Sequence, residues 1–575
     1  SVLPGSDTAR VTDQVVHFEL PRSDQFSRSA DMSLVLEGIS VMRDLHLPGR
    51  SVAMGCHGAA ATSHSLATST AIDILRRGGN AADAAIAACA VQCVVEPGST
   101  GVGGDNFVLY APSGTNTTGG GTVYGINGSG RAPAGLNAEF LRERGSEQIA
   151  LTSPHAVTVP GAVDSWCMLH HRFGRLPLAQ LLQPAIDHAE HGFPVTERVA
   201  VDWRRNQAKL RADPNAARMW LKDGASPEFG DTFRQPEHAK VLREIATKGR
   251  DGFYTGWVAE DIVGYLRERG GTHTLEDFAA QEALWVDPIS ATYKGVKLLE
   301  IPPNGTGVIA LLMLNILRGF DLSRYDPVGV ERFHLEAEVT RLAFQVRDSF
   351  VADPAFAEVP TRKLLSMDFA DELRSGIDMT KAMPVPRAGT GAIDRDTVYL
   401  TVVDAEGNVC SFINSLFWQY GTGLCSPRTG VLLHNRGCGF TLAPGHPNCL
   451  QPRKRPLHTI IPAMALENGR PWLSFGVMGG AFQPVGQVHV LTNILDYAMN
   501  IQEALDNPRG FHTAGRFEAE RGIRDDVLAG LADLGHTVTR VEVPHGGGQA
   551  ILLDHVNGVL HAGSDPRKDG CALAY

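Results

Sequence analysis

Hydrophobic and polar positions change their period several times along the chain. Residues 81–95 are apolar on nearly every side, which predicts a fully buried helix. A shorter helix over 66–77, with Ser65 placed to cap it, ends at a glycine pair. Between about 175 and 350 apolar residues recur mainly at helical spacing, and the predicted helices there cover 176–190, 239–245, 258–269 and 328–350.

Other segments have the pattern of strands. A strand is predicted over 106–110, with a return strand over 122–126 after a turn rich in glycine and threonine. A second hairpin is predicted from 398–404 and 409–415, joined by a turn at 405–408. The chain therefore mixes helices and sheet, with antiparallel pairing in the sheet.

The least usual junction lies just before the second hairpin. The segment at about 374–396 is rich in proline, glycine and alanine and has no period, so we expect it to be mobile. It runs directly into an apolar strand at Thr397. Residues 1–48 are polar and uneven in pattern, which predicts an N-terminal extension.

Composition narrows the function classes. Among 575 residues, Lys and Arg number 52 and Asp and Glu 63, a net charge of −11 that argues against nucleic-acid binding. The 43% hydrophobic and 20% charged content is that of a globular protein. No apolar run of about 18 residues predicts a membrane span.

Nine scattered cysteines do not form the pattern of a disulfide framework. The first residues also lack a signal-peptide pattern. Both features favour a cytoplasmic location; a leader removed before Ser1 would instead indicate the periplasm or secretion.

Common catalytic motifs are absent, and the 21 histidines have no tight metal-ligand spacing, so neither a metal nor a cofactor is predicted. Thr397 remains as a candidate nucleophile. Cutting the peptide bond between Asp396 and Thr397 would free an α-amino group with a reference pKa near 7.7–8.0, which can accept the hydroxyl proton. A flexible segment before the bond and a rigid strand after it would suit such self-cleavage. An ordinary Thr at the start of a strand is the alternative.

A series of motifs in a fixed order favours the interpretation of Thr397 as a self-cleaving nucleophile. With these motifs the sequence resembles the γ-glutamyltranspeptidase family of N-terminal nucleophile hydrolases, over about 50–575. The motifs are RGGNAADAA at 77–85, EPGSTGVGGD at 96–105, VPG at 159–161, IPPNGTG at 301–307, DTVYLTVVDAEGN at 396–408, YGTG at 420–423, KRPL at 454–457, GVMGG at 476–480 and GSDPR at 563–567, followed by DG at 569–570.

The resemblance implies an α+β fold, a four-layer αββα sandwich, made as a proenzyme. Cleavage after Asp396 would give a large subunit of residues 49–396, with the extension 1–48 before it, and a small subunit of residues 397–575. Members are often αβ heterodimers, and a dimer of heterodimers stays open as the assembly of this chain.

Catalytic positions carry over residue by residue. Thr397 matches the nucleophile, and Ser415 matches the position whose hydroxyl bonds to it. Gly479 and Gly480 match the pair whose N–H groups form the oxyanion hole, a role that needs a backbone approach to about 3 Å. A simple tight turn is the alternative for the glycine pair.

In the transpeptidases an Arg binds the α-carboxylate of the glutamyl group and an acidic residue binds its α-amine. This pair of residues, the glutamyl grip, is altered here. Their carboxylate-binding Arg corresponds to Ser129, and Arg131 stands two residues later. The acidic residue that holds the substrate amine would precede Phe440, where Gly439 stands, and Arg436 lies nearby. Losing the acid and gaining arginine favours an anionic substrate over an amino acid. Structural ion pairing is the alternative for the arginines.

Further differences lie around this grip. Phe417 and Trp418 would form an apolar wall, with core packing as the alternative. His458 and Thr459 replace a Ser-Ser pair and are expected to contact the substrate, where His458 would add to the anion site; a core or surface position is the alternative for His458. The loop over 444–453 is short, which predicts a more open site in which water competes well with amine acceptors.

The segments GSGRAP at 128–133 and NRG at 435–437 resemble a branch of the family that includes oxamate amidohydrolases. The sequence thus predicts a self-processing Thr amidohydrolase acting on a small carboxylate-bearing amide. A γ-glutamyl hydrolase or transferase and a glutaryl or cephalosporin-type acylase are the alternatives. An uncleaved binding protein is the remote one. The expected partners are a small-molecule substrate, with no nucleic acid and no membrane.

Overall fold

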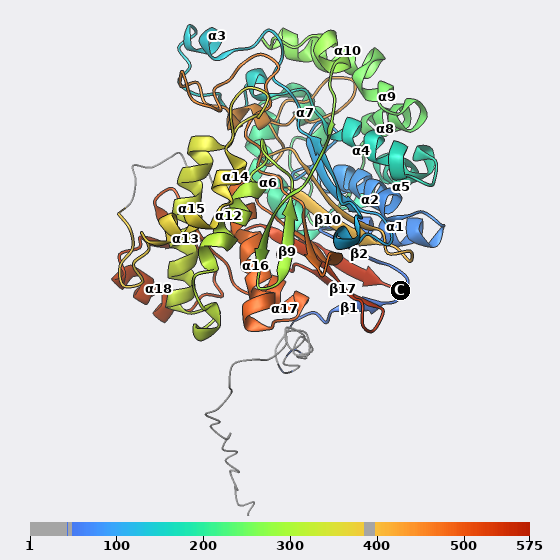
Figure 1. Ribbon diagram of the computed structural model, residues 1–575. Coiled ribbons are helices and arrows are strands. Elements are labelled where there is room, and N and C mark those ends of the chain that lie inside the picture. The colour runs from blue at the N-terminus through green and yellow to red at the C-terminus, as the bar shows by residue number, and fades with distance from the viewer. Residues whose placement is uncertain (1–42, 44–45, 47–48, 385–396) are drawn as a thin grey trace, which may run out of the picture. The chain divides into compact units, whose positions relative to one another are not determined.

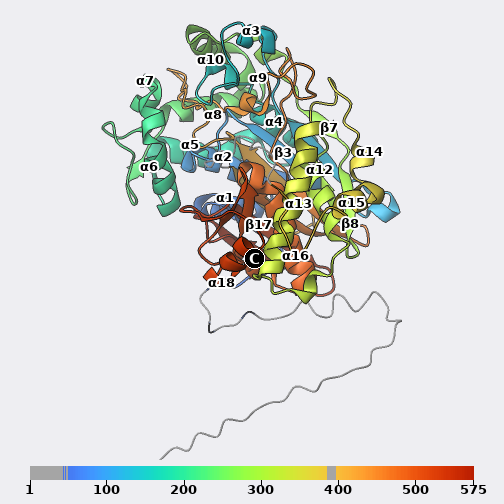
Figure 2. The ribbon, with the colours of Figure 1, turned by 90° about the vertical axis from the view of Figure 1, so that its left-hand side faces the viewer.

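Two seven-stranded sheets lie face to face, and helices cover both outer faces (Figures 1 and 2). The computed structural model describes residues 43, 46, 49–384 and 397–575. In Figure 1 the blue helices α1 and α2 and the yellow and orange helices α12, α13 and α16 lie on opposite sides of the strands. The four-layer αββα sandwich predicted from the sequence is confirmed.

The first sheet has the order β19-β2-β10-β11-β3-β4-β7, and all its neighbours pair antiparallel. Its centre is the predicted hairpin, β10 and β11. The strands are β2 Ala59–Thr62, β3 Asp105–Ala111, β4 Tyr124–Gly128, β7 Leu284–Val286, β10 Val398–Val403, β11 Val409–Ser415 and β19 Cys571–Ala574.

The second sheet has the order β1-β18-β17-β13-β12-β9-β8. Its strands are β1 Ala53–Gly55, β8 Ile289–Tyr293, β9 Val296–Glu300, β12 Ala463–Glu467, β13 Arg470–Met478, β17 Gly547–Asp554 and β18 Val559–Ser564. Two smaller sheets join β14 Gly510–Thr513, β15 Arg516–Ala519 and β16 Val538–Arg540, and β5 Phe193–Pro194 with β6 Thr232–Phe233.

Side chains of β10 alternate between two cores, as the period of a strand requires. Tyr399 and Val403 belong to the core between the sheets, whereas Leu400 and Val402 face the helices. Thr401 Oγ1 lies 2.6 Å from Ser474 Oγ on the facing sheet. This strand is therefore buried on both faces, which explains its continuous apolar pattern.

Helices α1 Ser65–Arg76, α2 Ala81–Val95 and α4 Ala162–Phe173 pack on the first sheet, and α5 Leu178–His191 covers α2. Helices α12 Gly307–Leu317, α16 Gln483–Tyr497 and α17 Ile501–Asp506 pack on the second sheet, and α13 Val330–Phe350 covers α12. The others are α3 Ala138–Arg142, α6 Glu197–Arg211, α7 Pro214–Trp220, α8 Pro236–Lys248, α9 Asp251–Tyr254, α10 Gly256–Glu268, α11 Leu275–Ala279, α14 Thr361–Leu364, α15 Met367–Arg374 and α18 Asp525–Asp533.

The predicted elements are largely present, with two differences. The N-cap of α1 is His64 instead of Ser65, because the His64 ring nitrogen Nδ1 accepts the N–H of Leu66 at 3.2 Å. The region predicted as mostly helical also contains β7, β8 and β9. These strands have three to five residues each and lie at or beside sheet edges, so their pattern is too short to be recognised.

Part of the segment predicted to be mobile is described. Residues 374–384 are held by hydrogen bonds, among them Arg374 Nε to the Ile316 carbonyl at 2.8 Å and Met383 N to Glu338 Oε2 at 2.8 Å. Residues 385–396, with Asp396, lie outside the described residues, as does most of the 1–48 extension.

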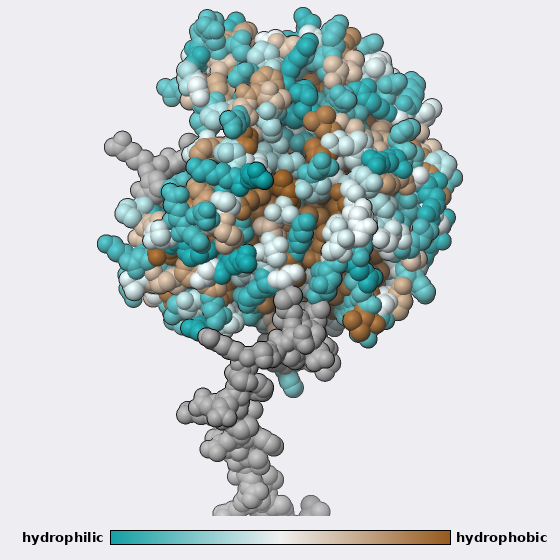
Figure 3. Space-filling view, viewed as in Figure 1, coloured by the Kyte–Doolittle hydropathy of each residue, from teal (hydrophilic) through white to brown (hydrophobic). Residues whose placement is uncertain are grey.

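Within the described part of the chain, no helix combines the length and the apolar character needed to cross a bilayer. On the face shown in Figure 3, hydrophobic residues gather near the middle, and the margin is mostly hydrophilic.

Candidate active site

Three adjacent strands of the first sheet bring candidate residues to one end of the sandwich. Thr397 immediately precedes β10, and Ser415 is the last residue of β11. Because Val398 pairs with Asn414, the register places Thr397 opposite Ser415. Ser415 in turn pairs with Asp105, the first residue of β3. The predicted nucleophile and its hydroxyl partner thus meet by strand pairing alone.

Ser415 is the centre of a group of hydrogen bonds beside Thr397. Ser415 Oγ lies 3.0 Å from Thr397 Oγ1. It also accepts the N–H of Phe417 at 2.8 Å and an N–H of Arg436 at 3.3 Å. Two N–H groups thus point to the Ser415 oxygen, and its hydroxyl lies within hydrogen-bond distance of the predicted nucleophile.

Helix α16, which packs on the second sheet, supplies another contact to Thr397. Gln483, the first residue of α16, directs Nε2 to Thr397 Oγ1 at 3.4 Å, while its Oε1 accepts the N–H of Ile461 at 3.1 Å. Gly479 and Gly480 lie between β13 and this helix, with φ of 122° and 58°. Both angles are in the left-handed region, where glycine is favoured. The glycine pair predicted as the oxyanion hole thus lies three residues before a side chain that touches Thr397.

Arg436 is a fully buried cation at this site. Besides Ser415, its guanidinium donates to Thr459 Oγ1 at 2.8 Å, and it lies 4.1 Å above the ring of Phe417. Phe417 has a φ of 78°, unusual for a side chain of this size. The structure therefore joins Thr397, Ser415, Phe417, Arg436 and Thr459 through direct contacts.

Asp105 anchors the neighbouring backbone and one imidazole. Its Oδ1 accepts the N–H groups of Gly130 at 3.1 Å and Gly161 at 3.0 Å, and its Oδ2 lies 2.9 Å from His458 Nε2. Burial alone would raise the pKa of Asp105, but His434, the His458 hydrogen bond and the Arg436 charge lower it to about 2. Asp105 is therefore ionised at neutral pH.

His458 is neutral beside this carboxylate. Burial, with the charge of Arg436 next, lowers its pKa to about 3 although Asp105 opposes the shift. Its Nδ1 accepts the N–H of Ile460 at 3.4 Å, which leaves the proton on Nε2 to donate to Asp105. Both ring nitrogens are thus used within the protein, so His458 holds Asp105 in place and does not present a charge to a substrate, contrary to the expectation from sequence.

Three other predicted residues, Arg131, Trp418 and Gly439, make contacts elsewhere around the cluster. The half-buried Arg131 donates to the Arg453 carbonyl at 3.2 Å. The Trp418 ring meets Phe417 edge-on at 6.2 Å. Gly439 ends the short 3-10 helix that begins at Arg436, and its carbonyl accepts from Asn448 at 2.6 Å.

The short loop over 444–453 does not leave Thr397 open in this structure of the full chain. Asn448 ties the loop to Gly439 and also accepts the N–H of Leu457 at 3.0 Å. Thr397 is only 1% exposed and Ser415 is fully buried. This burial is that of the uncleaved chain, so the openness predicted for the processed site stays a prediction.

Gln483, Asp105 and His434 were not among the predicted site residues. His434 Nδ1 lies 3.5 Å from Asp105 Oδ2, and its Nε2 lies 2.8 Å from the Thr158 carbonyl. Asp105 stands at the end of the glycine loop 101–104 and Gln483 three residues after the glycine pair, so both positions adjoin recognised motifs. Nothing in the local sequence marks His434.

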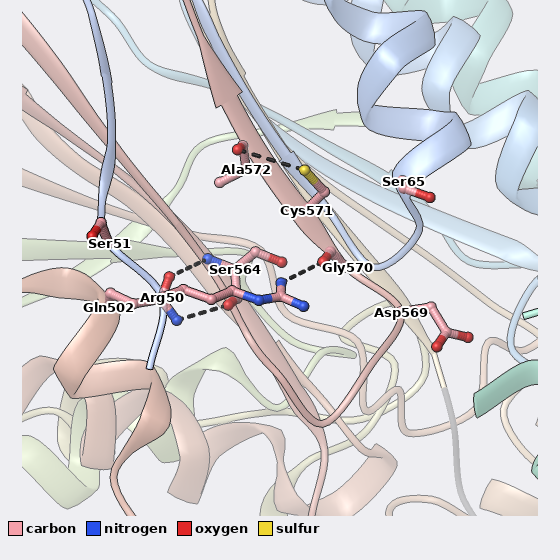
Figure 4. A pocket seen from close by; sticks show the side chains of 9 residues that line it. All are labelled: Arg50, Ser51, Ser65, Gln502, Ser564, Asp569, Gly570, Cys571 and Ala572. Atoms are coloured by element: carbon pink, nitrogen blue, oxygen red, sulfur yellow. Dashed lines mark hydrogen bonds between the residues drawn. The ribbon is translucent and has the colours of Figure 1, made fainter. Parts of the chain in front are cut away.

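The fold also contains a cavity that is lined by none of the residues of this cluster. It lies where residues 50–51 pass the end of β18 and the start of β19 (Figure 4). Arg50 donates there to the Gly570 carbonyl at 2.5 Å, and Asp569 accepts the N–H of Arg198 at the start of α6. Asp569, from the motif at 569–570, therefore has a structural role, because it caps the N-terminus of α6.

Comparison with known proteins covers nearly the whole chain. The model of the family described as Gamma-glutamyltranspeptidase matches residues 67–575. The Glutathione hydrolase-like YwrD proenzyme of Bacillus subtilis is 38% identical over 89% of this chain and 97% of its own length. The Oxamate amidohydrolase proenzyme of Klebsiella pneumoniae is 34% identical over 90% and 98%. The crystal structure of cephalosporin acylase from Bacillus halodurans superposes with a TM-score of 0.86 at 38% identity, covering 93% of this chain and 99% of that one.

Proposed function

The chain belongs to the γ-glutamyltranspeptidase family, and from this premise we propose that it cleaves itself before Thr397 and then hydrolyses a small amide that carries a carboxylate. That it is a self-processing amide hydrolase of the N-terminal nucleophile type follows from the family. The site residues and the substrate are the proposal. The observation that carries it is the contact chain from buried Arg436 through Ser415 to Thr397.

Self-cleavage comes first. Thr397 Oγ1 attacks the carbonyl carbon of Asp396, the C–N bond breaks, and the nitrogen becomes the free amine of Thr397. The resulting ester joins Asp396 to the threonine oxygen, and water hydrolyses it to a carboxylate and a hydroxyl. The products are a chain ending at Asp396 and a chain of 575 − 396 = 179 residues beginning with the nucleophile.

Substrate cleavage reuses the same oxygen. Thr397 Oγ1 attacks the amide carbon while its α-amine takes the hydroxyl proton. The N–H groups of Gly479 and Gly480 stabilise the oxyanion. The amine returns the proton to the leaving nitrogen, which departs as ammonia or an amine and leaves an ester on Thr397. Water, deprotonated by the amine, then releases the acid.

Arg436 selects an anionic substrate. A buried guanidinium pairs well with a carboxylate in two parallel hydrogen bonds. Its contacts with Ser415 and Thr459 place it beside the nucleophile, so the carboxylate and the scissile carbonyl must be close together in the substrate. Oxamate, with adjacent carboxylate and amide and no ammonium group, has this shape.

A substrate panel tests the proposal on the processed enzyme. Oxamate, a γ-glutamyl anilide and a glutaryl amide are compared by kcat/KM, with Thr397→Ala as the blank. Preference for oxamate over the others supports the proposal. Preference for the γ-glutamyl compound, as the name of the YwrD relative suggests, or for the glutaryl amide, as that of the acylase suggests, overturns the substrate but not the nucleophile.

Two further proposals follow from the sequence. Hydrolysis should dominate over transfer to amine acceptors, and amine addition to the assay checks this by the fraction of acyl-amine product. The cytoplasm is the proposed location.

A further inference from the structure

Three possible metal ligands meet away from Thr397, in the helical layer over the second sheet. His334 and Glu338 lie one turn apart on α13, and His536 lies between α18 and β16. One ligand atom from each lies within 4.8 Å of the others. His334 and Glu338 are fully buried and His536 is 6% exposed.

Hydrogen bonds fix the tautomer of His334. Its Nε2 lies 2.9 Å from the Asp378 carbonyl, which can only accept, so this nitrogen carries the proton. Its Nδ1 therefore presents a lone pair, toward His536 Nε2 at 2.7 Å. Metal-bound histidines commonly donate their other N–H to a backbone carbonyl in this way, which orients the ring.

Glu338 completes the set with an oxygen. Oε1 lies 2.8 Å from Arg341, and Oε2 accepts the N–H of Met383 at 2.8 Å. Each carboxylate oxygen has a second lone pair for a metal. Arg341 also faces the cluster and repels a cation, while the His512 ring lies 6.4 Å from that of His536.

We propose that His334 Nδ1, Glu338 and His536 Nε2 bind one Zn²⁺ ion. Zinc accepts nitrogen and oxygen ligands in a tetrahedral arrangement, and Zn–N bonds of about 2.0–2.1 Å put two ring nitrogens roughly 3.3 Å apart. The present 2.7 Å separation of the two nitrogens must therefore widen by only about 0.6 Å. His536 must also move its proton from Nε2 to Nδ1.

The ion would link parts of the chain on both sides of Thr397. His334 and Glu338 precede Thr397 in the sequence, and they are hydrogen-bonded to Asp378 and Met383. His536 follows Thr397. Zinc would thus fasten the end of the large subunit to the small one. Zinc binding itself does not depend on the proposed catalytic function, so the two can fail separately.

Metal binding is measured directly on the full-length protein after tag removal and dialysis against EDTA. Zinc chloride titration by calorimetry and metal analysis after desalting should give one zinc per chain. His536→Asn and His334→Asn should each weaken binding at least about tenfold, the scale found for lost support around a metal. His171→Gln, an exposed histidine on α4, is the matched control and should bind as the wild type does.

Two results would overturn the site: no zinc retained by the wild type, or equal retention by the wild type and both histidine variants. Circular dichroism checks that each variant folds. Glu338→Gln provides an independent variant of similar volume, expected to weaken binding as well. Cobalt in place of zinc should give the visible absorption of a tetrahedral ion in the wild type and lose it in His536→Asn.

Discussion

At the scale of single residues, Thr397 is the proposed nucleophile, and its oxygen lies 3.0 Å from that of Ser415. Thr397→Ala should therefore stay a single chain on a denaturing gel and lose at least about 10³-fold in activity, as loss of a nucleophile does. Thr397→Ser keeps a hydroxyl and should still yield two bands. An active, uncleaved Thr397→Ala protein would exclude the mechanism.

Arg436 and Arg131 separate two interpretations of the lost glutamyl grip. Arg436 touches Ser415 and Thr459, whereas Arg131 donates to the Arg453 carbonyl. Arg436→Met should lower kcat/KM for a carboxylate-bearing amide roughly 30- to 1000-fold, because the substrate charge loses a buried partner. This factor corresponds to about 2–4 kcal/mol of lost transition-state stabilisation. Arg131→Met, the matched variant, should change kcat/KM less than tenfold. A larger loss of kcat/KM in Arg131→Met than in Arg436→Met would mean that Arg131 binds the substrate anion.

His458 predicts how stability depends on pH. Its folded pKa of about 3 lies below the reference of 6.5, so between these values the unfolded chain binds more protons and the free energy of unfolding falls as pH falls. Asp105, at about 2 against 3.8, adds a loss in the same direction at lower pH. His458→Gln can still donate to Asp105 but no longer titrates, so urea unfolding should show a slope shallower by about 1.4 kcal/mol per pH unit between pH 4 and 6. An unchanged slope would mean that His458 is protonated when folded.

At the scale of elements, the end of β4 and the start of α4 are in backbone contact. A Cβ on Gly161 would lie 2.0 Å from the Gly128 carbonyl oxygen, and the Gly161 N–H also holds Asp105. Gly161→Ala should therefore cost about 3 kcal/mol or more, the range of severe overpacking, measured by chemical unfolding. Gly264→Ala in α10 is the control: it meets nothing within 4 Å and should stabilise by about 0.4–1 kcal/mol. A tolerated Gly161→Ala would show that this contact can open.

At the scale of the whole molecule, cleavage at Thr397 would leave two interleaved chains. Strand β2 of the first part lies between β19 and β10 of the second, and the second sheet contains β1, β8 and β9 from the first part around four strands from the other. Separating the fragments would break both sheets. After processing they should therefore elute together in native gel filtration and part only in denaturant. Separation with secondary structure intact would contradict the shared sheets.

Helices and strands could be predicted from the sequence wherever their hydrophobic pattern was long. Helix α2 and strand β10 could be predicted from long, nearly apolar runs that are buried on all sides, and β11 from its place after the turn at 405–408. The short strands β7 to β9 could not be found, because pairing at or beside a sheet edge gives three to five residues no distinctive period. The site was only partly predictable, because Gln483 reaches it from helix α16 on the second sheet and His434 reaches it from a loop.

The sequence by itself determined the family, the αββα architecture and the candidate nucleophile, because each depends on local motifs in a fixed order. Only the tertiary structure decided what the surrounding charges do. Arg436 became a neighbour of Ser415, and His458 a neutral donor to Asp105, because burial and contacts between distant segments set these states. The meeting of His334, Glu338 and His536 could not be predicted from the sequence, since Glu338 and His536 are 198 positions apart in the chain (536 − 338).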